Sequence, residues 1–86
     1  MVGPEIEVGV KLFASLREAV GREQVAVRVP AGASARDLLD ALCARYPAVA
    51  AQRRALAVAV NMELCRGERV LQAGDEVALL PPVGGG

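Results

Sequence analysis

The sequence predicts an α+β fold in which one main helix packs against a single mixed sheet of about five strands. Residues 6–12 and 25–29 alternate between apolar and polar side chains, which is typical of strands with one buried face. Residues 34–46 repeat apolar side chains every three or four positions, as an amphipathic helix does. Apolar runs at 56–60 and 76–80 supply further strands. One helix laid across one sheet is the economical way to bury these faces.

The first third of the chain is predicted to form two strands joined by a short helical turn. The alternation of residues 6–12 stops at Phe13, and Leu16 then lies four residues before another apolar side chain. Gly21 follows at once, which suits a helical turn closed by a glycine. The second strand, 25–29, is ended by Pro30. These two strands are expected to pair as an antiparallel ribbon.

Ser34 opens the clearest helix of the sequence. Its hydroxyl can cap the free backbone amides, and Asp37 sits at the third helical position, where a carboxylate favours the positive end of the helix. Pro47 is expected to stop the helix. The apolar stripe between these residues is predicted to pack on the sheet and consists of Leu38, Leu39, Leu42 and Tyr46.

The second half of the chain is predicted to be mainly strands. The continuous apolar run 56–60 has the pattern of a strand covered on both faces. A short hairpin-like segment is expected around 66–68, a turn at 73–75 and a last strand at 76–80. No internal repeat or linker is visible, so residues 1–80 are predicted to form one domain, followed by a flexible tail at 81–86.

The charge pattern argues against nucleic-acid and membrane-surface roles. Ten basic and ten acidic residues cancel, and they are scattered without a basic stripe. No apolar run reaches the roughly 20 residues that a membrane span needs, and the start lacks the basic region of an export signal. Cys43 and Cys65 are single and far apart, which fits reduced, mostly buried thiols in a reducing compartment. We therefore expect a soluble, cytoplasmic protein.

The C-terminal carboxylate is the best candidate for chemistry. The sequence has no histidine, and it shows no paired-carboxylate pattern, metal-ligand cluster or phosphate loop. A terminal carboxylate becomes reactive when it attacks the α-phosphate of ATP and forms an acyl adenylate. The last six residues, 81–86, can span roughly 20 Å when extended, enough to enter the active site of another protein. Their glycines pass a narrow tunnel, and Pro81 and Pro82 restrict φ just before them. The alternative without a function is a frayed chain end, or glycines that derive from an expression vector.

Three segments resemble the small, sulfur-carrying subunit of molybdopterin synthase, of the MoaD/ThiS-like β-grasp family. The most specific is 74–83 (GDEVALLPPV) followed by Gly85 and Gly86. Residues 11–18 (KLFASLRE) resemble the family's first strand and the turn after it, and 58–61 (VAVN) its central strand. The resemblance spans the whole chain and implies a β-grasp (ubiquitin-like) fold, with the first and last strands as parallel neighbours.

The resemblance also implies a sulfur-transfer cycle. An E1-like adenylating enzyme would use ATP to adenylate the Gly86 carboxylate, and a persulfide sulfur donor enzyme would convert it to a thiocarboxylate. The large molybdopterin synthase subunit would use that sulfur to build the molybdopterin dithiolene from cyclic pyranopterin monophosphate, within a heterotetramer. The carrier would bind no cofactor or metal and would not be catalytic on its own. Gly86 would carry the sulfur, and the partner-binding residues would be Leu80, Pro81, Pro82, Val83, Gly84 and Gly85.

Two departures from the family leave the carrier role intact but the identity of the partner less defined, and other functions also stay open. The family often has Phe-Phe where this chain has Leu79 and Leu80, and Thr or Ser where it has Gly84. One alternative is a sulfur carrier for thiamine, cysteine or tRNA thiolation, which the Pro-Pro-Val spacer disfavours. Another is a ubiquitin-like modifier joined to lysines through Gly86, and a third is a binding module with an inert tail. The sequence does not separate the first two alternatives, because both need the same activated carboxylate.

Overall fold

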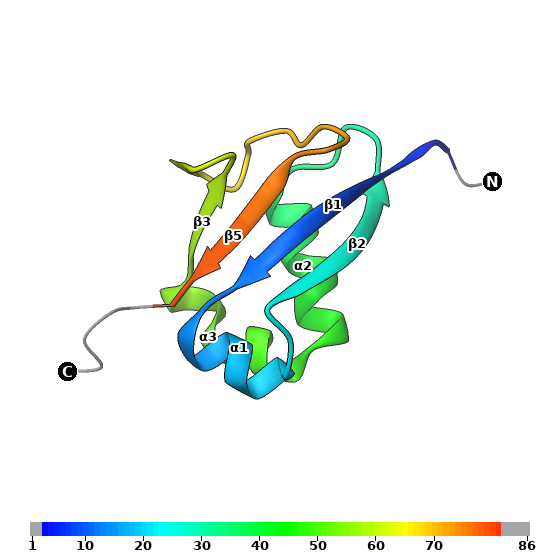
Figure 1. Cartoon of the computed structure of the whole chain (residues 1–86). Coiled ribbons are helices and arrows are strands. Elements are labelled where there is room, and N and C mark those ends of the chain that lie inside the picture. The colour runs from blue at the N-terminus through cyan, green and yellow to red at the C-terminus, as the bar shows by residue number, and fades with distance from the viewer. Residues whose placement is uncertain (1–2, 82–86) are drawn as a thin grey trace.

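The computed structural model describes residues 3–81 of the 86-residue chain, and these form a five-stranded sheet covered by helices (Figure 1). The strands are β1 (Glu5–Leu12), β2 (Gln24–Pro30), β3 (Ala57–Val60), β4 (Glu63–Cys65) and β5 (Glu76–Leu80). The helices are α1 (Ala14–Val20), α2 (Ala35–Arg45) and α3 (Pro47–Gln52), followed by one 3-10 turn, η1 (Arg53–Ala55). In this described part, no helix has the length and apolar character needed to cross a membrane.

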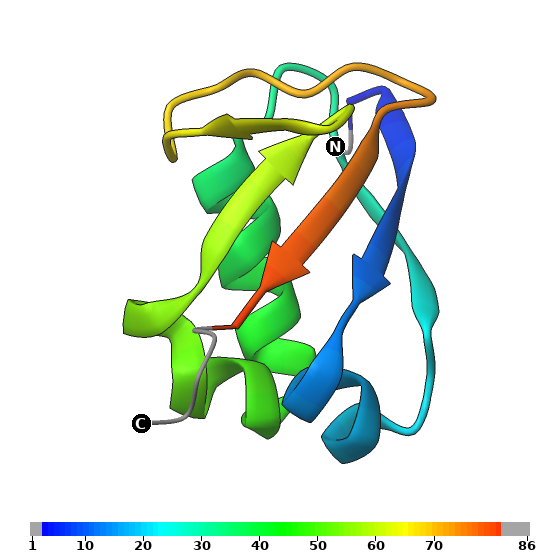
Figure 2. The ribbon, with the colours of Figure 1, turned by 60° about the vertical axis from the view of Figure 1, so that its left-hand side comes forward.

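The sheet is mixed, with the strand order β2-β1-β5-β3-β4. β1 and β5 are parallel neighbours, and the other three pairs of strands are antiparallel. Figure 2 shows the helices behind the sheet, so that its front face is left uncovered. First and last strands side by side, with helices on one face, define the β-grasp fold. The predicted fold class is therefore confirmed.

The core lies between the sheet and the helices, as the alternating pattern predicts. Each buried aliphatic side chain contributes roughly 1.5–3 kcal/mol to folding. Ile6, near the free end of β1, and Tyr46, at the end of α2, are only half-buried. The buried side chains of the strands and of α2 include Val8, Val10, Leu12, Val25, Val27, Val29, Leu38, Leu42, Val77 and Leu79.

The start of α2 has the predicted cap. The Asp37 amide donates to the Ser34 hydroxyl oxygen over 3.2 Å, and the Ser34 amide donates to the Asp37 carboxylate over 3.0 Å. This reciprocal capping box satisfies two backbone amides that the helix itself leaves without partners. It fixes the point at which the chain leaves β2 and crosses behind the sheet.

Pro47 ends α2 but does not end the helical region, so the expectation of a single main helix is incomplete. Tyr46 is extended, with φ −126° and ψ 105°, because a residue before proline avoids the helical conformation. Pro47 is then the first residue of α3, a position where its missing amide proton costs nothing. Val49 of α3 is fully buried. The short turn predicted at 16–21 is α1, closed by Gly21 at φ 81°.

Two predictions in the second half are wrong in detail. β3 is not covered on both faces along its whole length: of its two outward-facing residues, Ala57 is exposed, while Ala59 is only 7% exposed. The outer face of the sheet carries no helix, and the one neighbour of β3 on its far side is the three-residue β4. The hairpin turn lies at Asn61 and Met62, between β3 and β4, and not at 66–68. Residues 66–71 are instead a loop that pairs at Val70 with Ser34.

Candidate functional site

The last strand is an inner strand of the sheet and ends beside β3. Leu80 pairs with Ala57 on β3, while Leu79 pairs with Leu12 on β1. Pro81, the last residue that the structure describes, is half-buried. Because β5 has a neighbour on each side, the chain leaves the fold from a fixed position. The predicted site residues Pro82, Val83, Gly84, Gly85 and Gly86, and with them the predicted flexible tail, lie outside the described residues.

The uncovered side of the sheet near this exit is apolar. Side chains alternate along each strand, so the residues that precede and follow a core residue on the same strand lie on the opposite, uncovered face. Ala78 pairs with both Lys11 and Ala59, and Ala59 pairs in turn with Leu64 on β4. Leu64 is 73% exposed. We call this surface the docking face and define it as Phe13, Ala57, Leu64, Ala78 and Leu80; Ala59 lies on the same side of the sheet but is only 7% exposed.

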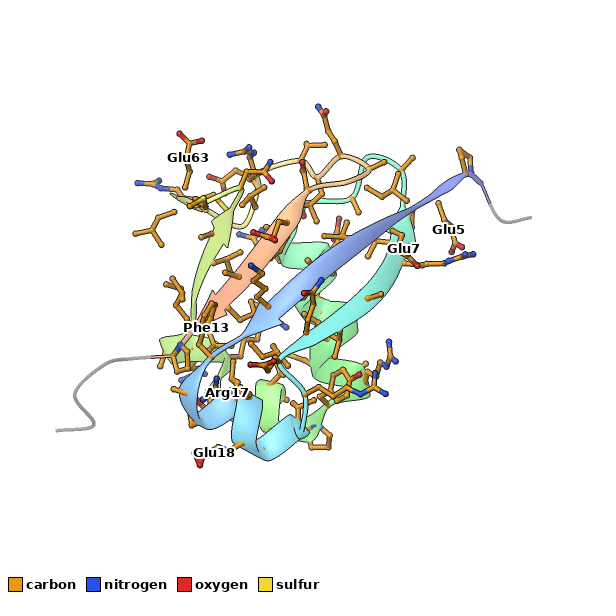
Figure 3. The ribbon with its side chains drawn as sticks, viewed as in Figure 1. Glu5, Glu7, Phe13, Arg17, Glu18 and Glu63 are labelled. Atoms are coloured by element: carbon orange, nitrogen blue, oxygen red, sulfur yellow. The ribbon has the colours of Figure 1, made fainter. Side chains whose placement is uncertain are left out.

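Of the residues of this face, only Leu80 was predicted from the sequence as a binding residue, and Phe13 is the largest of those that were not singled out. It follows β1 directly in an extended conformation, with φ −125° and ψ 154°, so its side chain is on the same side of the sheet as that of Lys11. Its side chain is 41% exposed, and Figure 3 places it near the end of β5. The signal available in the sequence was a lone aromatic residue directly after an alternating strand.

Leu80 belongs to the docking face and Leu79 to the core. Leu79 is 1% exposed, whereas Leu80 is half-buried and its antiparallel partner Ala57 is exposed. At the position where relatives were expected to have two aromatic residues, this chain therefore uses one leucine for packing and one for the surface. The predicted role of Leu80 as an apolar anchor is compatible with this placement.

One ion pair borders the docking face. The Lys11 ammonium lies 3.3 Å from the Glu76 carboxylate, and both side chains are nearly half exposed. Exposed pairs of this kind contribute at most about 1 kcal/mol to stability. The pair instead gives the apolar face a polar rim on the β1 side.

The side chains of Asn61 and Asp75 have a structural role. The Asn61 amide donates to the Asp75 carboxylate over 3.0 Å, and the Glu76 backbone amide donates to the Asn61 side-chain oxygen over 3.0 Å. The Gln72 backbone amide donates to the other Asp75 oxygen over 2.8 Å. These hydrogen bonds, that of Gln72 first, lower the pKa of Asp75. This network ties the start of β5 to the end of β3, so it fixes where β5 begins and thus where the chain leaves the sheet.

The cysteines lie away from this face. Both are half-buried free thiols, and Cys43 accepts a weak contact of 3.9 Å from the Arg53 guanidinium. Burial raises the pKa of the Cys65 thiol. Among residues 3–81, no group of three or more histidine, cysteine or acidic side chains lies close enough together to hold a metal ion.

A β-grasp domain that delivers its C-terminus from an inner strand, beside an open apolar face, defines the class of small ubiquitin-like carrier and modifier proteins. The ThiS family model matches residues 10–86. The chain belongs to the ThiS family.

Two relatives and one solved complex show the range of this similarity. The molybdopterin synthase sulfur carrier subunit of Arabidopsis thaliana is 32% identical over 81 residues, covering 94% of this chain and 84% of that protein. Small archaeal modifier protein 1 of Haloferax volcanii is 38% identical over 84 residues, covering 88% of this chain and 97% of that protein. Its crystal structure superposes with a TM-score of 0.81 at 37% identity, covering 93% of this chain and 99% of that one. A chain of the Amycolatopsis orientalis BexX/CysO complex has a TM-score of 0.70 at 26% identity, covering 92% of this chain and 99% of that one.

Proposed function

We propose that this chain is the sulfur carrier subunit of molybdopterin synthase, with the sulfur held on Gly86. The observation that carries the proposal is the geometry of the exit. An inner strand ends beside an uncovered apolar face, and six residues with three terminal glycines follow it. A rigid face can bind a partner while the C-terminal residues enter the active site of that partner. Relatives that match nearly the whole chain are named as this subunit.

The chemistry is proposed to begin with activation of the carboxylate. An adenylating enzyme would position ATP so that a Gly86 carboxylate oxygen attacks the α-phosphate and releases pyrophosphate. The terminal sulfur of a persulfide donor would then attack the acyl carbon and displace AMP. A thiol would cleave the resulting S–S bond and leave the thiocarboxylate on Gly86. The carrier would bind no cofactor in this cycle, because ATP is used by the activating enzyme.

Delivery of the sulfur is proposed to occur in a complex with the large synthase subunit. The docking face, with Leu80 at the end of β5, would pack on that subunit, while Pro81, Pro82, Val83, Gly84 and Gly85 lead Gly86 to its active site. The thiocarboxylate sulfur would become part of the molybdopterin dithiolene, formed from cyclic pyranopterin monophosphate. A related chain that was solved within the BexX/CysO complex supports the use of this fold as a bound subunit. We expect a heterotetramer of two carriers and two large subunits, in the cytoplasm.

Mass spectrometry tests the proposal. Incubation of the full chain with a matching adenylating enzyme, ATP and a persulfide donor should raise its mass by about 16 Da, since sulfur replaces one oxygen. The matched control lacks Gly86 and should show no gain while its circular dichroism stays unchanged. An unchanged mass of the full chain, with an enzyme that loads a known relative under the same conditions, would contradict the proposal.

A second candidate function is protein modification. It is favoured by the 38% identity to small archaeal modifier protein 1 and by the TM-score of 0.81 to its crystal structure. In this function a lysine amine of a target would attack the activated Gly86 carbonyl and form an isopeptide bond. Cells that produce the chain would then contain Gly86 joined to lysines, detectable by peptide mass spectrometry. Sulfur loading without such conjugates would select the carrier function.

A further inference from the structure

A groove of about 600 Å³ lies where β4 ends, between the outer edge of β3 and the first turns of α2. Its volume is in the range of specific ligand sites. It meets the docking face at Ala57 and Leu64 and then continues around the edge of the sheet, away from that face. None of the steps proposed for sulfur transfer uses the rest of this groove.

The groove combines an apolar floor with a basic rim. The floor includes the half-buried side chains of Leu39, Leu56 and Val58. Three arginines line it, and one of them, Arg53, is already paired with the Asp40 carboxylate. The other two, Arg36 and Arg54, are exposed, and within residues 3–81 no carboxylate lies within ion-pair distance of either. The rim therefore has two guanidinium groups available for an anion.

The position of Arg36 is set by the backbone around it. Its amide donates to the Gly67 carbonyl oxygen over 2.9 Å. A Cβ atom at Gly67 would lie 3.1 Å from both Nε and Nη2 of Arg36, so the absence of a side chain at Gly67 leaves room for the guanidinium. The amides at the start of α2 are occupied, since Ala35 donates to the Arg69 carbonyl over 2.8 Å and Asp37 to Ser34. An anion in the groove would thus meet guanidinium groups rather than helix amides.

The last strand of the same chain ends beside this groove. Leu80 pairs with Ala57, which lines the groove, and Arg54 is only three residues before Ala57. The five residues beyond Pro81 span at most roughly 17 Å when extended, and Arg54 is at most roughly 11 Å of chain from Ala57, so a segment that starts beside Ala57 is long enough to reach Arg54. Those five residues hold apolar side chains at Pro82 and Val83 and no charge except the terminal carboxylate. Their chemistry matches an apolar floor with a basic rim.

We propose that the groove binds the C-terminal segment of its own chain, with Val83 on the apolar floor and the Gly86 carboxylate beside the guanidinium groups of Arg36 and Arg54. Bidentate contacts between guanidinium and carboxylate give such a site its selectivity for an anion. A partner that uses the C-terminus must first withdraw it from the groove. This inference goes beyond the proposed function and holds for an unloaded chain without any partner.

NMR on the isolated, isotope-labelled full chain tests the inference. At low salt, the amides of Gly85 and Gly86 should show heteronuclear NOE values close to those of the folded strands. Val83 methyl groups should give NOE cross-peaks to Leu56 and Leu64. Raising the salt to about 0.5 M, where the screening length is a few ångströms, should lower the NOE values of both glycines. The double variant Arg36→Gln, Arg54→Gln should lower them already at low salt.

The control variant is Arg28→Gln, an exposed arginine on β2 at the opposite edge of the sheet. It removes one positive charge and should leave the C-terminal NOE values unchanged. The inference is overturned if Gly85 and Gly86 are equally mobile in the wild-type chain and the double variant. It is also overturned if the Val83 cross-peaks grow with protein concentration, because the groove would then bind the C-terminus of a second copy. Neither readout involves sulfur or an adenylating enzyme, so failure here leaves the proposed function standing.

Discussion

Leu79 and Leu80 are adjacent in the sequence but lie on opposite sides of β5. Leu79 packs in the core at 1% exposure, and Leu80 contributes to the docking face beside the chain exit. The alternation of side chains along a strand thus places one leucine in the core and the other on the face that we propose to bind the partner. Substitutions at these two positions separate the two contributions.

We expect Leu80→Asp to weaken binding to the large synthase subunit at least tenfold, which corresponds to about 1.4 kcal/mol. Its melting temperature should change little, since the new carboxylate is on an open face. Leu79→Ala is the matched variant and should lower the free energy of unfolding by about 2–5 kcal/mol, because it leaves a cavity in the core. Titration calorimetry and thermal unfolding measure the two effects. Equal losses of affinity and stability for Leu80→Asp would instead make Leu80 a core residue.

Asp75 shows how one carboxylate makes the stability of this fold depend on pH. Hydrogen bonds from Gln72 and Asn61 hold the pKa of Asp75 below its ordinary value. The folded chain therefore binds a proton at Asp75 less readily than the unfolded chain does. The contribution is fully present above the ordinary pKa of about 4 and is lost as the pH falls through the lower, folded value.

We predict that Asp75→Asn lowers the free energy of unfolding by about 1 kcal/mol at pH 7, because hydrogen bonds to a charged group are lost. The difference from the wild-type chain should begin to shrink below the ordinary pKa of about 4 and approach zero only below the lower pKa of Asp75 in the folded chain, where Asp75 itself is protonated. Urea unfolding at a series of falling pH values measures this change. Glu63→Gln, at an exposed carboxylate of β4, is the control. Its difference in free energy of unfolding from the wild-type chain should not shrink in this way as the pH falls. A difference that stays constant between pH 7 and pH 3 would rule out the charge of Asp75 as its cause.

At the scale of the elements, the sequence was most informative where a pattern depends on neighbouring residues alone. The alternation of β1 and β2 and the capping box of α2 are such patterns, and the structure confirms all three. Whether a strand is covered on one face or on both depends instead on contacts between residues that are far apart in the sequence. The apolar run of β3 was taken for a strand buried on both faces, but its residues are mostly alanine and valine, which an open face also tolerates.

Pro47 illustrates a different limit of sequence reasoning. Proline excludes the helical conformation at Tyr46 and favours it at the first position of a new helix. The first effect predicted the end of α2, and the second, which was overlooked, begins α3. The buried Val49 shows that α3 is needed to close the core below the sheet. A proline between two apolar helical segments is thus a break in a helical layer and not its end.

At the scale of the whole molecule, the sequence indicated the chain exit but not the surfaces around it. The Gly-Asp turn before β5 and the proline and glycine residues after it are contiguous, so they could be recognised as one motif. The docking face joins Phe13, which follows β1, with residues of β3, β4 and β5, and the groove joins Arg36 of α2 with Arg54 of η1. These residues become neighbours only through the strand order, which local patterns do not determine. The composition also did not indicate the basic rim of the groove, because the basic and acidic residues of the whole chain cancel.

The number of residues between β5 and Gly86 sets how far the terminal carbonyl can reach. The sheet holds the start of this segment in place, and in the proposed function Gly86 must reach a fixed reaction centre in the partner. Deleting Gly86, or adding one residue after it, displaces the reacting carbonyl by roughly 3.3–3.6 Å along an extended segment. A shift of even about 1 Å can cost a hundredfold in rate, so either change should abolish sulfur transfer. Thermal unfolding should stay unchanged, since β5 ends at Leu80. Replacing Gly84 by Ser, which preserves the length, is the matched control and should retain transfer. Normal sulfur transfer by the chain with one added residue would contradict this prediction. It would show that the number of residues between β5 and the reacting carbonyl does not determine the rate.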